Sequence, residues 1–215
     1  MKTFKCWTDK MTFRTFTFRA FYVLHFSLCT LLVAGCFDEP EPAYKSVPEG
    51  ARIYLKDQGL ADLKGQSFDA SKIDYLNLDR NALTNVDEVA SLTGLKWLRL
   101  NSNQLSALPP LGELKALRRI YLRDNRFNEV PETLKDLPSL TDIDLSGNPV
   151  SEIPEWLAKK EGLEFLSFSR TKITKLPDDL SAWKRLKALQ LGDLQMSPDE
   201  MARIRKALPD VAIVF

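Results

Sequence analysis

Histidine and cysteine are scarce in this sequence. The single histidine, His25, and the three cysteines, Cys6, Cys29 and Cys36, all lie within the first 36 of 215 residues. Residues 37–215 therefore cannot form a Ser-His-Asp triad, a cysteine nucleophile, a disulfide or a metal site with histidine or cysteine ligands. A site made of carboxylates alone, or of serine and lysine, stays open in principle. We predict no cofactor, no metal, no catalytic residue, and a fold stabilised by its apolar core.

The sequence also lacks an excess of charge of either sign. The whole chain carries 30 basic and 29 acidic residues, of which residues 1–35 hold five and one. The remainder has 25 basic and 28 acidic residues, a net charge near −3. Such a balance provides no electrostatic surface for nucleic acid, so we predict no nucleic-acid partner. The remaining length suits one domain with a short tether.

A long hydrophobic run is missing too. The uncharged stretch from Ala20 to Gly35 is 16 residues long, whereas a membrane-spanning helix needs about 20. A basic segment precedes this stretch, and small residues end it, which is typical of a secretory signal. We therefore assign residues 1–35 to a signal peptide and treat a permanent transmembrane helix as the weaker alternative. Met11 is a second candidate for the start of translation, beside Met1.

The signal peptide ends in Leu32-Val33-Ala34-Gly35-Cys36. This segment resembles the lipobox of bacterial lipoproteins, although Val33 stands where that family most often has leucine. The resemblance implies that the thiol of Cys36 receives a diacylglyceryl unit and that its freed amine is acylated. Two or more acyl chains anchor a protein stably to a membrane. Phe37, which stands in place of an aspartate, implies sorting to the outer membrane. The alternative is a cleaved signal that happens to end beside a cysteine.

Residues 36–49 contain the lipidation site and a tether. From Phe37 to Glu49 the sequence is rich in proline and acidic residues and has no periodicity, so we expect an extended, solvated spacer. Residues 50–215 differ, because they carry a repeat that continues to the C-terminus. Six segments align, with first residues 22, 22, 23, 23 and 23 positions apart. They are residues 73–81, 95–103, 117–125, 140–148, 163–171 and 186–194.

The shared pattern is L-x-x-L-x-L-x-x-N-x-L-x-x-L. A period of this length is typical of a solenoid, in which each unit buries its apolar side against its neighbours. The pattern resembles the leucine-rich repeat. The resemblance implies an α/β solenoid with a curved parallel sheet on its concave side and short helices and turns on its convex side. The segment from Ile53 to Leu63 matches the pattern with Gln58 in place of asparagine, so we interpret it as an atypical first repeat.

Several positions in the repeat have a predicted structural role. Alternation within each L-x-L strand places the two leucines in the core. An asparagine ladder at the corner after each strand is expected to satisfy backbone groups of its own and the next turn. The ladder consists of Asn81, Asn103, Asn125 and Asn148, and it fails at Thr171 and Leu194.

An apolar column lies in the second half of the repeats, formed by Leu92, Leu114, Leu137 and Trp183. Lys160 falls in the same column, which indicates either a weak spot or a side chain that reaches outward.

The C-terminus is expected to close the solenoid. Ser197, Pro198 and Glu200 form a capping-box pattern for a helix that ends near Ala207. A last strand within residues 211–215 would then cover the sheet edge. We align its Leu208, Val211 and Ile213 with Leu186, Leu189 and Leu191.

The repeat pattern does not fix which residues occupy the exposed side of the strands. On this side the first four strands present aromatic rings among arginines, and both residue types are enriched at binding interfaces. The alternative is that these side chains satisfy one another within the sheet. Two aspartates follow on one strand, but without a supporting acid or metal ligand we do not interpret them as catalytic. The candidate binding residues are Tyr54, Tyr75, Trp97, Arg99, Arg119, Tyr121, Arg123, Asp142, Asp144 and Phe165.

These observations predict a monomeric lipoprotein of the bacterial envelope, lipid-anchored in the outer membrane, whose concave face binds a protein. Two alternative functions without catalysis are glycan or peptidoglycan binding and a purely structural spacer role. A carboxylate-based enzyme is the least favoured function. The domain would face either the periplasm or the cell surface.

Overall fold

The computed structural model describes residues 50–66 and 68–215. The predicted signal peptide, Cys36 and the tether lie outside these residues. The described residues belong to one compact unit, which contains the whole sheet. No helix in the described ranges has the length and apolar character needed to span a bilayer.

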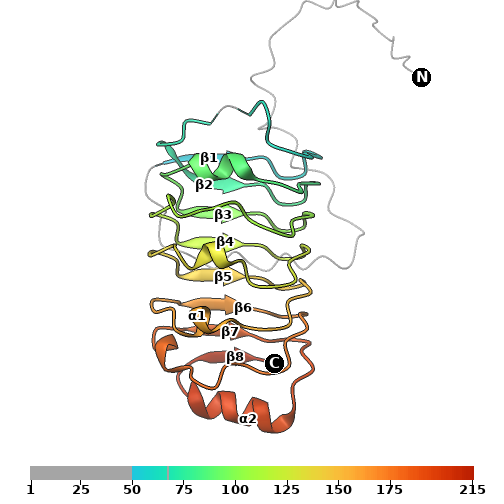
Figure 1. The fold of residues 1–215 in the computed structure, drawn as a ribbon, viewed down its shortest axis with the longest axis vertical. Helices are drawn as coiled ribbons and strands as arrows, with labels where there is room; N and C mark the ends of the chain where they lie inside the picture. Colours follow the sequence, from blue (N-terminus) through green and yellow to red (C-terminus); the bar gives the residue numbers. More distant parts are fainter. Residues whose placement is uncertain (1–49, 67) are drawn as a thin grey trace, which may run out of the picture. The chain divides into compact units, whose positions relative to one another are not determined.

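The unit is built on one parallel sheet of eight strands, arranged in the order in which they occur in the sequence (Figure 1). Each strand is followed by a connection that returns to the start of the next strand, so every turn of the chain adds one strand. The strands are β1 (Ala51–Tyr54), β2 (Ile73–Asn77), β3 (Trp97–Arg99), β4 (Arg119–Tyr121), β5 (Asp142–Asp144), β6 (Phe165–Ser167), β7 (Ala188–Gln190) and β8 (Ala212–Val214).

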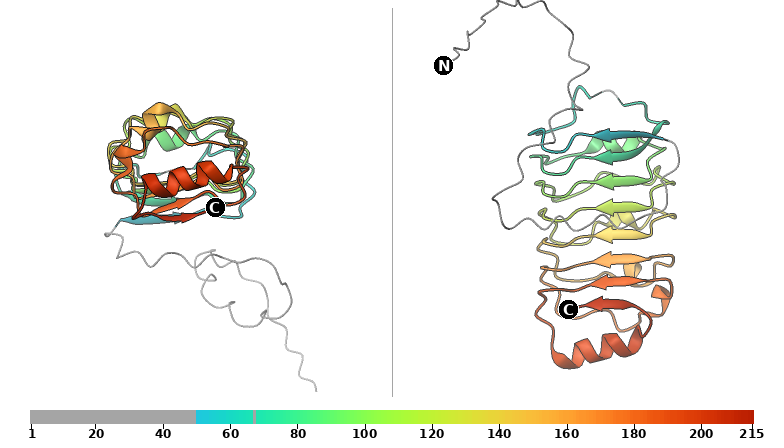
Figure 2. Two further views of the ribbon diagram at one scale, coloured as in Figure 1. Left: turned by 90° about the horizontal axis from the view of Figure 1, so that it is seen from below. Right: turned by 180° about the vertical axis from the view of Figure 1, so that it is seen from behind.

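Short helices lie on the side opposite the sheet, and Figure 2 shows the two layers end-on. They are η1 (Asp87–Ser91), η2 (Glu132–Leu134), α1 (Glu155–Ala158) and η3 (Ser181–Trp183). A longer helix, α2 (Pro198–Ala207), closes the C-terminal end. We call the side that carries the sheet the strand side and the opposite side the helix side.

The apolar core fills the space between these two sides. One apolar residue of each strand from β2 to β7 points into it and is fully buried, as the alternation predicted. These residues are Leu76, Leu98, Ile120, Ile143, Leu166 and Leu189, and they pair in register across the sheet. Because each repeat is thin, its leucines are buried only when the neighbouring repeats cover them.

The asparagine ladder is present, but it connects in the direction opposite to the one expected. The Asn103 side chain accepts a hydrogen bond from the Leu83 amide at 3.1 Å and donates to the carbonyls of Leu78 and Leu100, both at 3.0 Å. Leu78 and Leu83 belong to the turn before Asn103, not to the turn after it. At Thr171 the ladder is reduced to a bond within its own turn, from Oγ1 to the Phe168 carbonyl at 2.8 Å.

The residue just before each ladder position has a left-handed backbone conformation. In six turns this residue is not glycine, for example Arg80 and Ser102, each with φ of 55°. Gly147 occupies the same position with φ of 68°, and here a Cβ atom would fall on the carboxylate of Asp124. That carboxylate passes over Gly147 to reach Arg170 at 3.0 Å, so glycine leaves room for an ion pair that bridges two turns.

The C-terminal cap confirms the predicted helix and corrects two details. Ser197 accepts the Glu200 amide at 3.2 Å, but the Glu200 carboxylate does not return to the Ser197 amide as in a capping box. It accepts instead from the Leu176 amide and from Arg203, both at 2.8 Å.

The second detail is the register of the last strand. Leu189 pairs with Ile213 and not with Val211, two residues away from our alignment. The added helix α2 changes the length of the last connection, and a shift of two residues keeps the same side chains facing the core.

Candidate functional site

Four aromatic rings form a continuous row across the strand side, which we call the aromatic strip: Tyr54, Tyr75, Trp97 and Tyr121. The ring centroids of Tyr54 and Tyr75 lie 5.2 Å apart, and those of Tyr75 and Trp97 lie 4.9 Å apart. Trp97 and Tyr121 follow at 5.8 Å. Trp97 meets both neighbours edge-to-face, with interplanar angles of 86° and 89°. Strands β1 to β4 thus bring together rings that are 21 to 24 residues apart in the chain. Tyr75 and Trp97 are paired across the sheet, and the other two contacts are diagonal, two positions from the paired residue.

Arginines cover the ring faces of the strip. The guanidinium carbon of Arg119 lies 5.0 Å from the centroid of Trp97, within the range of a cation–π contact. Those of Arg52 and Arg99 lie 5.9 Å from the centroids of Tyr75 and Tyr121, respectively. The arginines therefore hold the rings in place.

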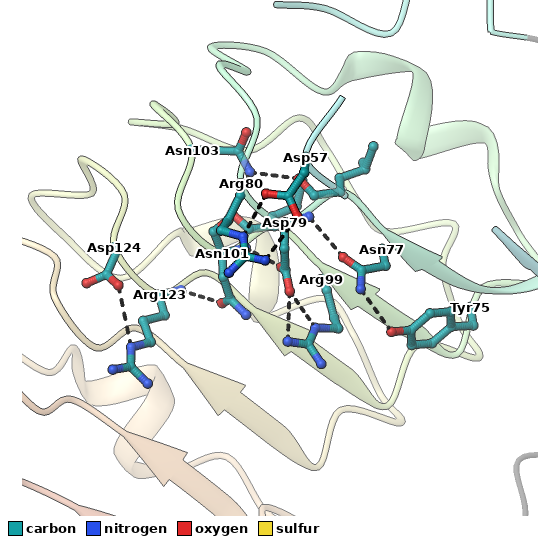
Figure 3. A network of polar contacts seen from close by, with 12 residues as sticks. Asp57, Tyr75, Asn77, Asp79, Arg80, Arg99, Asn101, Asn103, Arg123 and Asp124 are labelled. Carbon is teal, nitrogen blue, oxygen red and sulfur yellow. Dashed lines mark hydrogen bonds and ion pairs between the residues drawn. The ribbon is translucent and has the colours of Figure 1, made fainter. Parts of the chain in front are cut away.

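Each of the three candidate arginines also forms an ion pair. Two nitrogens of Arg99 lie 2.7 Å from one carboxylate oxygen of Asp79, while the other oxygen accepts the Asn101 amide at 2.8 Å. Arg119 Nε lies 3.0 Å from Asp142, and Arg123 Nε lies 3.5 Å from Asp124. Figure 3 shows the pairs of Arg99 and Arg123 at the corner of the repeats. The strip therefore carries little uncompensated positive charge.

Two predicted surface residues prove to be buried. Tyr75 is 4% exposed, because Tyr54, Trp97 and Arg52 cover it, and Asp142 is 3% exposed below Arg119. Burial raises the pKa of Asp142, and the charge of Arg119 opposes this rise. The Asp142 oxygen near Arg119 has no hydrogen-bond partner, so the pair is held by charge rather than by a directed hydrogen bond. Neither residue can contribute much area to a partner.

The other predicted residues remain at the surface to different degrees. Tyr54 is the most accessible ring of the strip, with 61% of its surface exposed. Trp97, Tyr121, Asp144 and Phe165 are half-buried, as are the three candidate arginines Arg99, Arg119 and Arg123. Asp144 accepts the Ser146 amide at 2.9 Å. Phe165, on β6, makes no ring contact with the strip in the part of the chain that the structure describes.

Three residues outside the predicted set support the strip. Asn77 donates to the Tyr75 hydroxyl at 3.3 Å and accepts the Asp79 amide at 3.0 Å (Figure 3). Asp79 positions Arg99, and Arg52 covers Tyr75. Their signal in the sequence is weak, because a polar residue at an outward strand position is the ordinary case.

The geometry offers no support for catalysis by carboxylates. Asp142 and Asp144 lie two positions apart on β5, but the first is buried below an arginine and the second caps a turn. Within the described ranges, no three His, Cys, Asp or Glu side chains gather in a way that could hold a metal ion. Asp142 and Asp144 therefore do not form a paired-carboxylate site.

Comparison with known proteins agrees with the geometry. A family model described as Leucine Rich Repeat matches residues 139–159. An internalin from Listeria monocytogenes has a similar structure, with a TM-score of 0.52 and 20% identity over 67% of this chain and 50% of that one. The described part of the chain has the leucine-rich repeat fold. A leucine-rich repeat protein from Leptospira interrogans aligns at a TM-score of 0.39 and 25% identity, over 67% of this chain and 55% of that one.

About a third of the chain is also similar to a short part of a much longer protein. It is 35% identical over 79 residues to a probable serine/threonine-protein kinase, pats1, from Dictyostelium discoideum. The match covers 33% of this chain and 2% of the kinase. The chain also spans only about half the length of the two solved structures. The family model and the internalin support the repeat fold, and the activities of the larger proteins do not follow from these likenesses.

Proposed function

We propose that this chain is a protein-binding module of the bacterial envelope and that the aromatic strip is its contact surface. The observation that carries the proposal is the row of four rings held by arginines across β1 to β4. Aromatic and arginine side chains supply much of the energy at protein interfaces, because they bury large areas at a low entropic cost. Here their mutual packing restricts them before a partner binds, which reduces that cost further.

Protein is favoured over glycan as the partner. Sugars bind aromatic residues by stacking on an uncovered ring face. In the strip, Arg119 covers a face of Trp97, and Tyr75 and Tyr121 meet the indole edge-to-face. A protein can use the ring edges and the guanidinium groups together. Glycan or peptidoglycan binding and a structural spacer role remain the alternatives, and we propose no enzymatic activity.

The anchoring part of the proposal rests on the sequence. A basic segment, a short apolar segment and Val33-Ala34-Gly35-Cys36 support cleavage before Cys36 and lipidation of its thiol. We propose that the mature chain is held by lipid in the outer membrane, with residues 37–49 as a tether. The repeat domain would then act as a monomer close to the lipid surface.

The strip is tested by single substitutions of Trp97 and Tyr121 to alanine in residues 37–215. Proteins captured from envelope extract by the immobilised wild-type domain are identified, and their affinities are measured for each variant. We expect each substitution to weaken binding by about 2 kcal/mol or more, as for a central interface residue. Urea midpoints should stay near the wild-type value, because both residues are half-buried on the strand side.

Trp156→Ala is the matched control, since this tryptophan is also half-buried but lies on the helix side in α1. It should leave the affinity unchanged. Wild-type affinity in both strip variants would contradict the proposed surface. Retention of peptidoglycan fragments instead of protein would keep the surface and change the class of partner.

The anchor is tested by Cys36→Ser in the full chain. Cells are supplied with a fatty acid that carries an alkyne, and the label on the protein is measured. We expect the variant to lose the label and to accumulate as unprocessed precursor, because the acyl acceptor is missing. Equal label on both proteins would refute lipidation at Cys36.

A further inference from the structure

Lys160 interrupts the apolar column on the helix side of the repeats. The residues at the same position in the other repeats, Leu92, Leu114, Leu137 and Trp183, are fully buried. Lys160 is half-buried, and its ammonium group donates to the carbonyls of Leu137 at 2.9 Å and Lys135 at 3.1 Å. The side chain therefore reaches out of the core and ends beside the preceding repeat.

The ammonium group of Lys160 has no carboxylate within ion-pair distance among the described residues. Burial lowers the pKa of Lys160, and only the more distant charge of Asp136 opposes this effect. The exposed ammonium group of Lys135, whose carbonyl Lys160 contacts, likewise has no ion-pair partner in the described part of the chain. By contrast, Lys159 pairs with Glu155 at 2.9 Å. Lys160 and Lys135 thus both lack an ion pair among the described residues, whereas Lys159 has one.

These lysines line a hollow. Its walls are Lys135, Glu155, Trp156, Lys159 and Lys160, and its volume is about 460 Å³. The indole of Trp156 and the aliphatic stems of the lysines supply an apolar wall, and the ammonium groups supply charge. Glu155 and Trp156 belong to α1 and Lys159 and Lys160 follow it. Helix α1 lies on the side opposite the sheet (Figures 1 and 2).

We propose that this hollow binds a phosphate group. A phosphate offers several strong acceptor oxygens, which match the compact ammonium groups of Lys135 and Lys160, while Lys159 is already paired with Glu155. It would replace the missing counter-charge of Lys160 and Lys135. The source of the phosphate is either inorganic phosphate or the headgroup of an anionic phospholipid, whose glycerol and acyl parts would contact Trp156. The site is independent of the aromatic strip, since the two lie on opposite sides.

The experiment is a binding titration of residues 37–215, followed by amide chemical shifts and tryptophan fluorescence. The three probes are inorganic phosphate, dihexanoyl phosphatidylglycerol and the zwitterionic dihexanoyl phosphatidylcholine, all below their micellar concentrations. We expect shifts at residues 135, 156 and 160 with the first two probes. Phosphatidylglycerol binding much tighter than phosphate identifies the lipid headgroup as the source, and equal affinity identifies free phosphate.

The matched variants remove charge while keeping side-chain length. Lys160→Met should weaken binding by about tenfold, equivalent to about 1.4 kcal/mol. Lys135→Met should act similarly and does not threaten the fold, since Lys135 is exposed. Lys115→Met, at an exposed lysine outside the hollow, should bind as wild type. No shift with either anionic probe, equal binding of phosphatidylcholine, or wild-type affinity in both hollow variants would overturn the proposal.

Discussion

At the scale of single residues, four asparagines connect each turn of the chain to the turn before it. Each amide bonds to backbone groups of two turns at once, as Asn148 does with the carbonyls of Leu122 and Leu145 at 2.9 and 3.0 Å. These backbone groups lie at buried corners where no strand or helix can pair them. The side chain therefore replaces a missing backbone partner, which is why an apolar substitute of similar size would not serve.

We predict that Asn103→Ala destabilises the domain by about 1–3 kcal/mol, because the Leu83 amide and two carbonyls lose their partner. Urea denaturation measures the change. Asn101 is unsuitable as a control, because its side chain accepts the Arg123 amide at 2.9 Å. Asn128 is exposed and makes no side-chain hydrogen bond among the described residues, so Asn128→Ala should change stability by less than about 0.5 kcal/mol. Equal losses in both variants would contradict the role of the ladder.

At the scale of elements, helix α2 is attached to the last repeats by charge as well as by apolar packing. Ile204 is fully buried, and Arg203 donates to the Glu200 carboxylate and to the Leu176 carbonyl at 3.0 Å. The hydrogen bond from Arg203 holds the pKa of Glu200 below its ordinary range, assisted by the Leu176 amide. Glu200 therefore links the helix to the preceding turn instead of closing a capping box.

The sign of this shift predicts a pH dependence. Because the pKa of Glu200 is lower in the folded chain than in the unfolded chain, its carboxylate stabilises the fold at neutral pH. That contribution disappears as the pH falls from about 4.3 through the folded pKa. We expect Glu200→Gln to cost about 1.5–3 kcal/mol at pH 7.

The difference in urea midpoint from wild type should shrink near pH 3. Glu161→Gln, at an exposed glutamate, should show no difference at either pH. A constant difference for Glu200→Gln would argue against an ionised cap.

At the scale of the whole molecule, stability is the sum of contacts between neighbouring repeats. The sheet has no disulfide to support it, so each interface depends on side chains such as Trp183, which is fully buried. Its indole nitrogen donates to the Leu157 carbonyl of the preceding repeat at 3.0 Å. In a stack of this kind, loss of one interface between repeats lowers the stability of all the repeats that unfold together with it.

We predict that Trp183→Ala destabilises the domain by about 3–5 kcal/mol, as a large deletion in a packed core. Trp183→Phe should cost less, because it keeps most of the volume and loses the hydrogen bond. Urea denaturation of both variants compares the two contributions. An alanine variant that is as stable as wild type would show that the C-terminal repeats contribute little to the cooperative unit.

The fold could be predicted from the sequence because the same strand-and-turn pattern occurs in several successive repeats. Each L-x-L segment predicts a strand, and the common spacing predicts that neighbouring strands pair in register, as Leu98 and Ile120 do. The capping signals of α2 are local, so Ser197 and Pro198 also marked its start correctly. The alignment of β8 was wrong, because the connection before it is unique in the chain and alternation alone cannot detect a shift of two residues.

The sequence by itself determined which residues face the strand side, because a strand alternates strictly between two sides. Only the tertiary structure decided which of them are accessible. Tyr54 and Tyr75 both point outward, from the neighbouring strands β1 and β2, yet one is 61% exposed and the other 4%. The difference arises because exposure depends on whether long side chains from neighbouring repeats cover a position. The pairing of Arg119 with Asp142, and the outward path of Lys160, were decided by the same contacts between repeats.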